Sequence, residues 1–135
     1  MTRTEARELL MQLLYQMEVN GDFSAQFAQK YMEEQKVGPA PAAYIAKLTA
    51  AVRENKDAID ALINAFTKGW KTTRMPKVDL AILRLAVSEI LYEEDLPPQV
   101  SINEAVNIAK KYSTEESGKF INGVLGAIVR NRTNA

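Results

Sequence analysis

The sequence predicts an all-α protein, and three observations support this fold class. Apolar residues recur at helical spacing along almost the whole chain, and no segment shows the strict alternation of a half-buried strand. Capping-box sequences of the form S/T-x-x-E mark three helix starts, at Thr2, Ser101 and Ser113. Proline-containing segments mark breaks between helices, at residues 37–41, 75–76 and 96–98.

About seven helices follow from these signals, and they fit a single-domain helical bundle over residues 1–135. The expected helices cover residues 3–19, 23–35, 41–53, 56–67, 77–93, 102–112 and 116–131. The connections between them are short, as is typical of a compact bundle.

The first helix, over 3–19, carries two apolar stripes when its residues are placed about 100° apart. One stripe is an ordinary core face of alanine, leucine and methionine. The other consists of Met11, Tyr15 and Val19, which are spaced by four residues and lie roughly opposite the first stripe. This second stripe is covered either by another helix of the same domain or by a protein partner.

The next three helices, over 23–35, 41–53 and 56–67, lead to a basic segment, KGWKTTRMPK at 68–77. This segment has four positive residues, no acidic residue and one tryptophan. We expect Trp70 to anchor the segment against the bundle, because large aromatic side chains are mostly buried. The alternative is a platform on which a nucleic-acid base stacks.

The helix over 77–93 is expected at the centre of the fold. Its segment VDLAILRLAVSEILY is apolar nearly all round, and such a helix is usually packed by neighbours on several sides. Its main polar residues are Asp79, Arg84, Ser88 and Glu89. The following helix, over 102–112, is expected to begin at the Ser101 capping box.

The last helix, over 116–131, accepts glycines that each cost about 1 kcal/mol relative to alanine in a helix interior. Gly123 and Gly126 fall on the face that should be exposed, so either another backbone or a binding partner is expected to come close there. Gly118 lies in the first turn beside the Ser113 capping box, where free amides and the helix dipole could hold a phosphate. Close helix packing is the alternative explanation for Gly118.

Composition excludes most catalytic chemistry. The 135 residues contain no cysteine and no histidine, so thiol nucleophiles, common metal sites and imidazole catalysis are absent and no cofactor is expected. No apolar run approaches the roughly 20 residues that cross a bilayer, and the N-terminus lacks a signal-peptide pattern, so a cytoplasmic protein is expected. The net charge of zero means that any nucleic acid would need a local basic patch and help from a partner.

Several segments resemble those of a known family. VDLAILRLAVSEI, VSINEAVNIAKKY and GKFINGVLG are similar to segments of the bacterial NusB family of transcription antitermination factors, and the similarity begins at ARELLMQLLYQ. The specific part is INEA with a lysine-bearing helix end, followed by KF-x-NGVL. The resemblance implies a helical fold of two small antiparallel bundles and no catalytic activity.

The resemblance also implies an RNA target and protein partners. NusB-like proteins pair with a small-subunit ribosomal protein called NusE, and the pair binds the boxA element of nascent RNA, notably in ribosomal RNA operons. This complex joins other Nus factors and RNA polymerase and suppresses termination. The protein would then be a scaffold that shares its RNA affinity with NusE, which is consistent with its zero net charge.

RNA-binding residues follow from the matched motifs. The family's arginine-rich N-terminal segment falls on TRTEARE, which implies RNA contacts at Arg3 and Arg7, although this chain has fewer arginines there than the family often has. The family also places the segment with Glu116 and Lys119 beside RNA. A lysine pairs with phosphate directly, whereas Glu116 is also explained by a capping role.

Partner-binding residues follow in the same way. Tyr15 and Asp79 match positions that the family uses against NusE. For Tyr15 this agrees with the second apolar stripe, so Met11 and Val19 are expected in the same interface. Asp79 is also explained by a favourable interaction of its charge with the start of a helix.

Two other functions are considered. A NusB-like domain of an RNA cytosine methyltransferase is excluded, because the chain has neither a cysteine nucleophile nor a cofactor domain. A structural helical adaptor, or a homodimer through Met11, Tyr15 and Val19, without any RNA role, remains an alternative.

Overall fold

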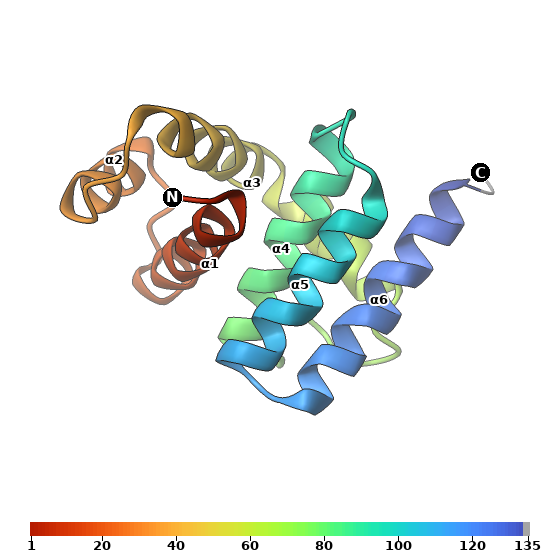
Figure 1. Ribbon diagram of the computed structural model, residues 1–135. Helices are drawn as coiled ribbons and strands as arrows, with labels where there is room; N and C mark the ends of the chain where they lie inside the picture. Colours follow the sequence, from red (N-terminus) through yellow and green to blue (C-terminus); the bar gives the residue numbers. More distant parts are fainter. Residues whose placement is uncertain (134–135) are drawn as a thin grey trace.

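The computed structural model describes residues 1–133, which form six α-helices and no strand (Figure 1). The helices are α1 (Arg3–Asn20), α2 (Ala25–Glu34), α3 (Pro39–Ala65), α4 (Lys77–Tyr92), α5 (Pro98–Tyr112) and α6 (Glu115–Thr133). The predicted all-α class is confirmed, and the helix count of about seven is approximately right. Within the described chain, none of these helices is both long enough and apolar enough to cross a membrane.

α1 begins and ends with local interactions that the sequence encodes. The Thr2 hydroxyl accepts a hydrogen bond from the Glu5 amide, and the Glu5 carboxylate accepts one from the Thr2 amide, so the predicted capping box is present. The helix ends at Gly21, whose φ of 64° lies in the left-handed region that glycine adopts without steric cost.

α3 is a single kinked helix where the sequence predicted two helices. Asn55 lies at the expected break and has non-helical angles, with φ at −126° and ψ at 18°. Its side-chain amide donates to the Ala51 carbonyl over 2.9 Å, at a position where a backbone amide would ordinarily donate. We attribute the kink to this side-chain group, which enters the hydrogen-bond ladder of the helix.

α4 occupies the centre of the molecule, as the sequence predicted. It packs against α1, α3, α5 and α6, and Figure 1 shows it between the group formed by α1, α2 and α3 and the pair formed by α5 and α6. Every residue from Asp79 to Ile90 is buried. The buried apolar residues form one cluster that includes side chains of all six helices.

Two predicted helix starts are wrong. α5 begins at Pro98, because proline at a first helical position has no amide to satisfy and has a suitable fixed φ. Ser101 therefore lies inside the helix, where its buried hydroxyl has no hydrogen-bond partner in the protein. At the start of α6, Thr114 and not Ser113 is the cap: its hydroxyl accepts from the Ser117 amide over 2.9 Å.

The glycines of α6 have two different environments. A Cβ at Gly118 would lie 3.3 Å from Cγ of Lys110 and 3.7 Å from Cγ1 of Val106, so close packing against α5 explains this glycine. At Gly123 no atom lies within 4 Å of such a Cβ, and at Gly126 only the side chain of Arg130 does. No neighbouring backbone in the described chain explains these two, and a close binding partner there stays a prediction.

Candidate functional site

Arg7 is buried where α1 meets α4 and α5. Its Nε donates to both carboxylate oxygens of Glu89, over 3.1 and 2.9 Å, and its Nη1 donates to Glu104 over 3.0 Å. Burial alone would lower the pKa of Arg7, but the charges of Glu89 and Glu104 outweigh it and raise this pKa. Only 4% of the side chain is exposed, so the guanidinium joins helices and offers almost no surface to RNA.

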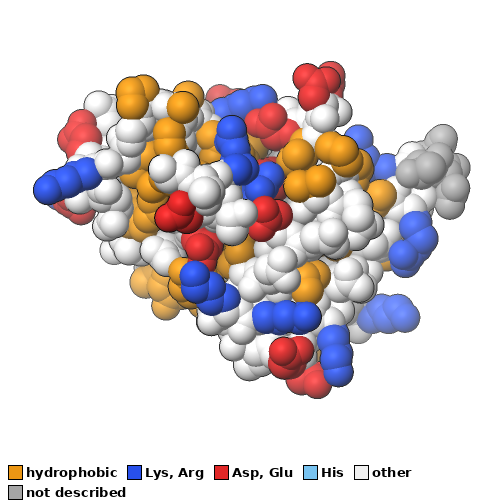
Figure 2. Space-filling view, in the orientation of Figure 1, with side chains coloured by type: hydrophobic (Ala, Val, Ile, Leu, Met, Phe, Trp, Pro, Cys, Tyr) orange, Lys and Arg blue, Asp and Glu red, His pale blue; other side chains and the backbone are white. Residues whose placement is uncertain are grey.

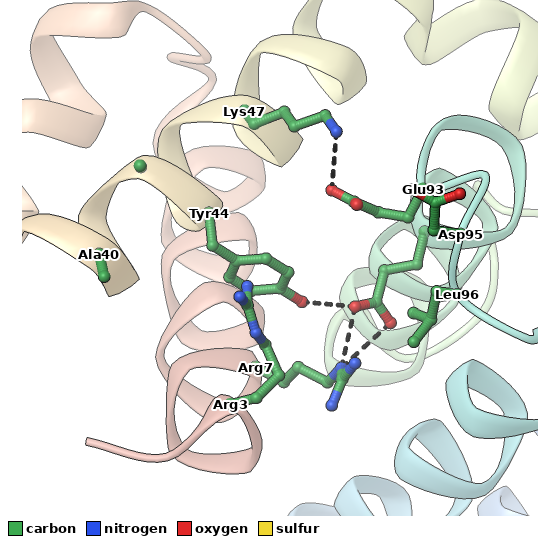
Figure 3. Close-up of a pocket in the computed structure, with 10 residues that line it drawn as sticks. Arg3, Arg7, Ala40, Tyr44, Lys47, Glu93, Asp95 and Leu96 are labelled. Carbon is green, nitrogen blue, oxygen red and sulfur yellow. Dashed lines mark hydrogen bonds and ion pairs between the residues drawn. The ribbon is translucent and has the colours of Figure 1, made fainter.

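Arg3 lies on the surface one helical turn earlier. Its guanidinium carbon is 4.0 Å from the ring centroid of Tyr44, a cation–π distance, and Tyr44 donates from its hydroxyl to Glu89 over 2.7 Å (Figure 3). Burial, followed by the charge of Glu89, raises the pKa of Tyr44, so this hydroxyl remains a donor at neutral pH. Of the two arginines predicted to contact RNA, Arg3 is the exposed one.

A cavity of about 490 Å³ lies beside this network (Figure 3). Arg3 and Tyr44 line one side of it, and the ion pair between Lys47 and Glu93, at 3.0 Å, lies on the other. Sequence reasoning did not single out Tyr44 or the function of Glu89. The sequence feature that could have predicted a buried ion pair at Glu89 is its carboxylate in an otherwise apolar helix, since a buried charge requires a partner.

A second cavity, of about 540 Å³, lies where the starts of α4 and α6 meet the loop that precedes α4. Its lining residues are Thr67, Trp70, Pro76, Asp79, Ser113, Thr114, Glu116, Ser117 and Phe120. Sequence reasoning assigned Asp79 to a protein partner and Glu116 to RNA, but the structure places both at this one cavity. Ser117 and Phe120, which complete it, were not predicted as site residues.

Asp79 is the buried charged residue of this second cavity. It is 2% exposed, and its Oδ2 accepts a hydrogen bond from the Ser117 hydroxyl over 2.9 Å. Its Oδ1 has no hydrogen-bond partner in the protein. This oxygen is itself buried, so it is an unpaired acceptor that costs the fold free energy, and a ligand in the cavity does not reach it directly.

Trp70 forms an aromatic wall of the same cavity. Its ring packs edge-on against Phe120, with centroids 5.4 Å apart and planes at 61°. The expectation of an anchored tryptophan is met by this contact, but the expected burial is wrong, because 55% of Trp70 is exposed. Much of its surface is therefore free to contact a ligand.

Glu116 and Lys119 project from the first two turns of α6 into solvent. Their side chains are 86% and 75% exposed, and the closest approach of carboxylate and ammonium is 3.9 Å. Exposed pairs of this kind contribute little energy, so the Lys119 ammonium is available to another anion. Glu116 makes no capping bond in the described structure, because Thr114 caps the helix.

The second apolar stripe of α1 is only partly exposed. Tyr15 is 38% exposed and Val19 is 59% exposed, as the sequence predicted for a partner surface. The prediction is wrong for Met11, which is 2% exposed and belongs to the hydrophobic core. Another part of the same protein covers Met11, so the available surface begins at Tyr15.

Comparison with known proteins identifies the family. The model of the NusB family matches residues 4–130. The transcription antitermination protein NusB of Acetivibrio thermocellus is 45% identical over 130 residues, which cover 96% of this chain and 90% of that protein. The solved structure of T. maritima NusB is 34% identical, with a TM-score of 0.86 over 96% of this chain and 92% of that one.

A crystal structure of the antitermination factors NusB and NusE in complex with dsRNA is also similar. That chain is 28% identical to this one and superimposes with a TM-score of 0.86, covering 97% of this chain and 99% of its own length. The chain described here therefore belongs to the NusB family of transcription antitermination proteins, which is not a family of enzymes.

Proposed function

We propose that the protein is a cytoplasmic antitermination factor that binds boxA-type RNA together with NusE. In this function it is a scaffold: the RNA and NusE are its direct partners, and other Nus factors and RNA polymerase join the complex through them. The observation that carries the proposal is the cavity at the starts of α4 and α6, taken together with the likeness to a NusB that was crystallised with NusE and dsRNA.

This cavity offers the three kinds of contact that single-stranded RNA needs. The exposed part of Trp70, beside Phe120, provides an aromatic surface for stacking a base. The exposed carboxylate of Glu116, which also lines the cavity, can accept a hydrogen bond from the amino group on a base edge. Lys119 supplies a positive charge for the phosphate backbone, and Arg3 supplies a second one at the start of α1.

Tyr15 and Val19 provide the surface for the protein partner. An aromatic side chain that is partly exposed beside an aliphatic one is a common anchor in protein interfaces. This surface lies on α1, whereas the cavity is built from α4, α6 and the loop before α4. The protein can therefore hold NusE and RNA at the same time.

The test is fluorescence anisotropy of labelled boxA RNA and of a scrambled RNA, with the protein alone and with NusE added. We expect tight binding of boxA, which strengthens with NusE, and much weaker binding of the scrambled RNA. Equal and weak binding of both RNAs in both conditions would contradict the proposal and leave a structural adaptor or a homodimer. Analytical ultracentrifugation of the same samples distinguishes those two.

Two variants locate the RNA on the protein. Trp70→Ala should weaken boxA binding by about 1–3 kcal/mol if a base stacks on this side chain. Lys30→Gln is the matched control for Lys119→Gln, because Lys30 is an exposed lysine on α2, far along the chain from the cavity. If Lys30→Gln and Lys119→Gln reduce the affinity equally, the cavity is not the RNA site.

A further inference from the structure

We propose that the exposed face of α5, formed by Asn103, Asn107 and Lys110, carries the RNA strand between Arg3 and Lys119. Lys110 contacts a backbone phosphate on this path, and Gly118 leaves room for its side chain beside α6. This inference rests on the proposed RNA-binding function and extends it to a helix for which no RNA contact was predicted.

The position of α5 follows from contacts on both of its sides. On one side it meets α1: Thr4 donates from its hydroxyl to Glu104 over 2.8 Å, and Lys111 pairs with Glu8 at 2.6 Å. On the other side it packs along α6, and Figure 1 shows α5 between α1 and α6. The direct path for an RNA strand from the start of α1 to the start of α6 therefore crosses α5.

The exposed face of α5 is free of negative charge. Asn103, Asn107 and Lys110 are exposed and follow one another at spacings of four and three residues, so they share one side of the helix. They span about 10 Å along the helix axis at 1.5 Å per residue. The nearby Glu104 is already engaged by Arg7 and Thr4, so it does not present an unpaired carboxylate to the RNA.

Lys110 is a lysine without an ion pair at the C-terminal end of α5 in the described structure. The neighbouring Lys111 is held by Glu8, and the hydrogen bond from that carboxylate is the main cause of its raised pKa. Lys110 forms no ion pair within the described chain, although Glu115 and Glu116 follow shortly after it. Figure 2 shows basic side chains over the end of α5 and the start of α6, with acidic side chains beside them.

Gly118 leaves room for the Lys110 side chain. A Cβ at position 118 would be 3.3 Å from Cγ and 3.6 Å from Cε of Lys110, so the stem of the lysine lies across the first turn of α6. Lys119, the expected phosphate contact, follows directly after this turn. A methyl group at position 118 would require the stem to shift by a few tenths of an ångström, so this glycine has a function in addition to close packing.

The experiment measures the salt dependence of RNA binding for the full-length protein with NusE. Lys110→Gln should lower the slope of log K against log salt by about 0.7, the value for one phosphate contact on a single strand. This corresponds to about a fivefold loss of affinity at 0.1 M salt, equal for boxA and scrambled RNA, since a phosphate contact does not read sequence. The control is Lys30→Gln, which replaces an exposed lysine on α2 and should leave the slope unchanged.

Gly118→Ala tests the position of Lys110 without changing charge. It should lower RNA affinity in the wild-type background and have no effect in the Lys110→Gln background, because the two changes act on the same contact. An unchanged affinity in Gly118→Ala would show that the glycine does not position Lys110.

The remaining outcomes separate this inference from the proposed function. If the wild-type protein binds boxA with NusE but Lys110→Gln leaves the slope unchanged, only the α5 path is wrong. If Lys110→Gln weakens NusE binding when no RNA is present, the exposed face of α5 is a protein interface and the inference is overturned. If the wild-type complex binds neither RNA, both proposals fail.

Discussion

The arginines at positions 3 and 7 have different functions, although one helical turn separates them. Arg7 points into the junction of α1, α4 and α5 and pairs with Glu89 and Glu104, whereas Arg3 remains on the surface over the ring of Tyr44. Whether each arginine is buried or exposed depends on where carboxylates lie in the folded protein. A sequence motif based on arginine spacing alone therefore predicts that both residues contact RNA. Only the structure shows that Arg7 is buried and Arg3 is exposed.

Replacing Arg7 should destabilise the fold strongly. Arg7→Met removes the positive charge that pairs with Glu89, which is 1% exposed, and leaves a buried carboxylate whose remaining hydrogen bond comes from the Tyr44 hydroxyl. We expect the free energy of unfolding, measured in urea, to fall by about 3–5 kcal/mol. The control is Arg3→Met, which loses an exposed cation–π contact and should cost no more than about 1 kcal/mol. Equal effects of the two substitutions would contradict the structural function of Arg7.

The stripe on α1 predicts opposite outcomes for two equivalent substitutions. Tyr15→Asp should abolish NusE binding in a pull-down and leave the fold intact, because an exposed position tolerates a charge at little cost. Met11→Asp should instead lower the melting temperature sharply, since it places a charge without a partner in the core. A normal NusE complex with Tyr15→Asp would remove α1 from the interface.

At the scale of helices, the sequence predicts well which segments are helical. It predicts less well the residue at which each helix begins. The Thr2 box is correct, and both of its hydrogen bonds are present. The Ser101 box is wrong because Pro98 begins the helix three residues earlier, and the same four-residue pattern then falls inside the helix. The kink at Asn55 follows from a side-chain bond that helical spacing does not encode.

The cap that the structure shows for α6, Thr114, can be compared experimentally with the cap that was wrongly predicted for α5, Ser101. Thr114→Ala removes the hydroxyl that accepts from the Ser117 amide, and it should lower the free energy of unfolding by about 1 kcal/mol. Ser101→Ala removes a buried hydroxyl that has no hydrogen-bond partner in the protein, so it should be neutral or stabilising. Chemical denaturation of both variants measures the difference, and a larger loss for Ser101→Ala would restore the sequence prediction.

Across the whole molecule, a second buried arginine joins α4 to α1 and α3. Arg84 of α4 donates to Asp60 of α3 over 2.9 and 2.7 Å and to Glu18 of α1 over 2.6 Å. The sequence predicts a central apolar helix with an arginine in it, but the carboxylates that pair with this arginine are 24 and 66 residues away in the chain. Such long-range pairs depend on the packing of helices, which spacing along one helix does not reveal.

The Arg84 cluster should make the stability of the molecule sensitive to acid. Burial raises the pKa of Glu18, but its hydrogen bond to Arg84 and the Arg84 charge outweigh burial, so the net pKa is lowered from 4.5. A carboxylate with a lower pKa in the folded state stabilises the fold above its unfolded pKa, and this contribution is lost as the pH falls through the folded value.

Glu18→Gln should therefore be less stable than the wild type by about 2 kcal/mol at pH 7, the value of a hydrogen bond to a charged group. The difference should shrink below pH 4.5 as Glu18 becomes protonated in the wild-type protein. Urea unfolding at a series of pH values from 7 to 3 measures both curves, with Glu94→Gln, an exposed residue without an ion pair in the described chain, as the control. A constant difference between Glu18→Gln and the wild type at all pH values would mean that the charge of Glu18 does not hold α1 to α4.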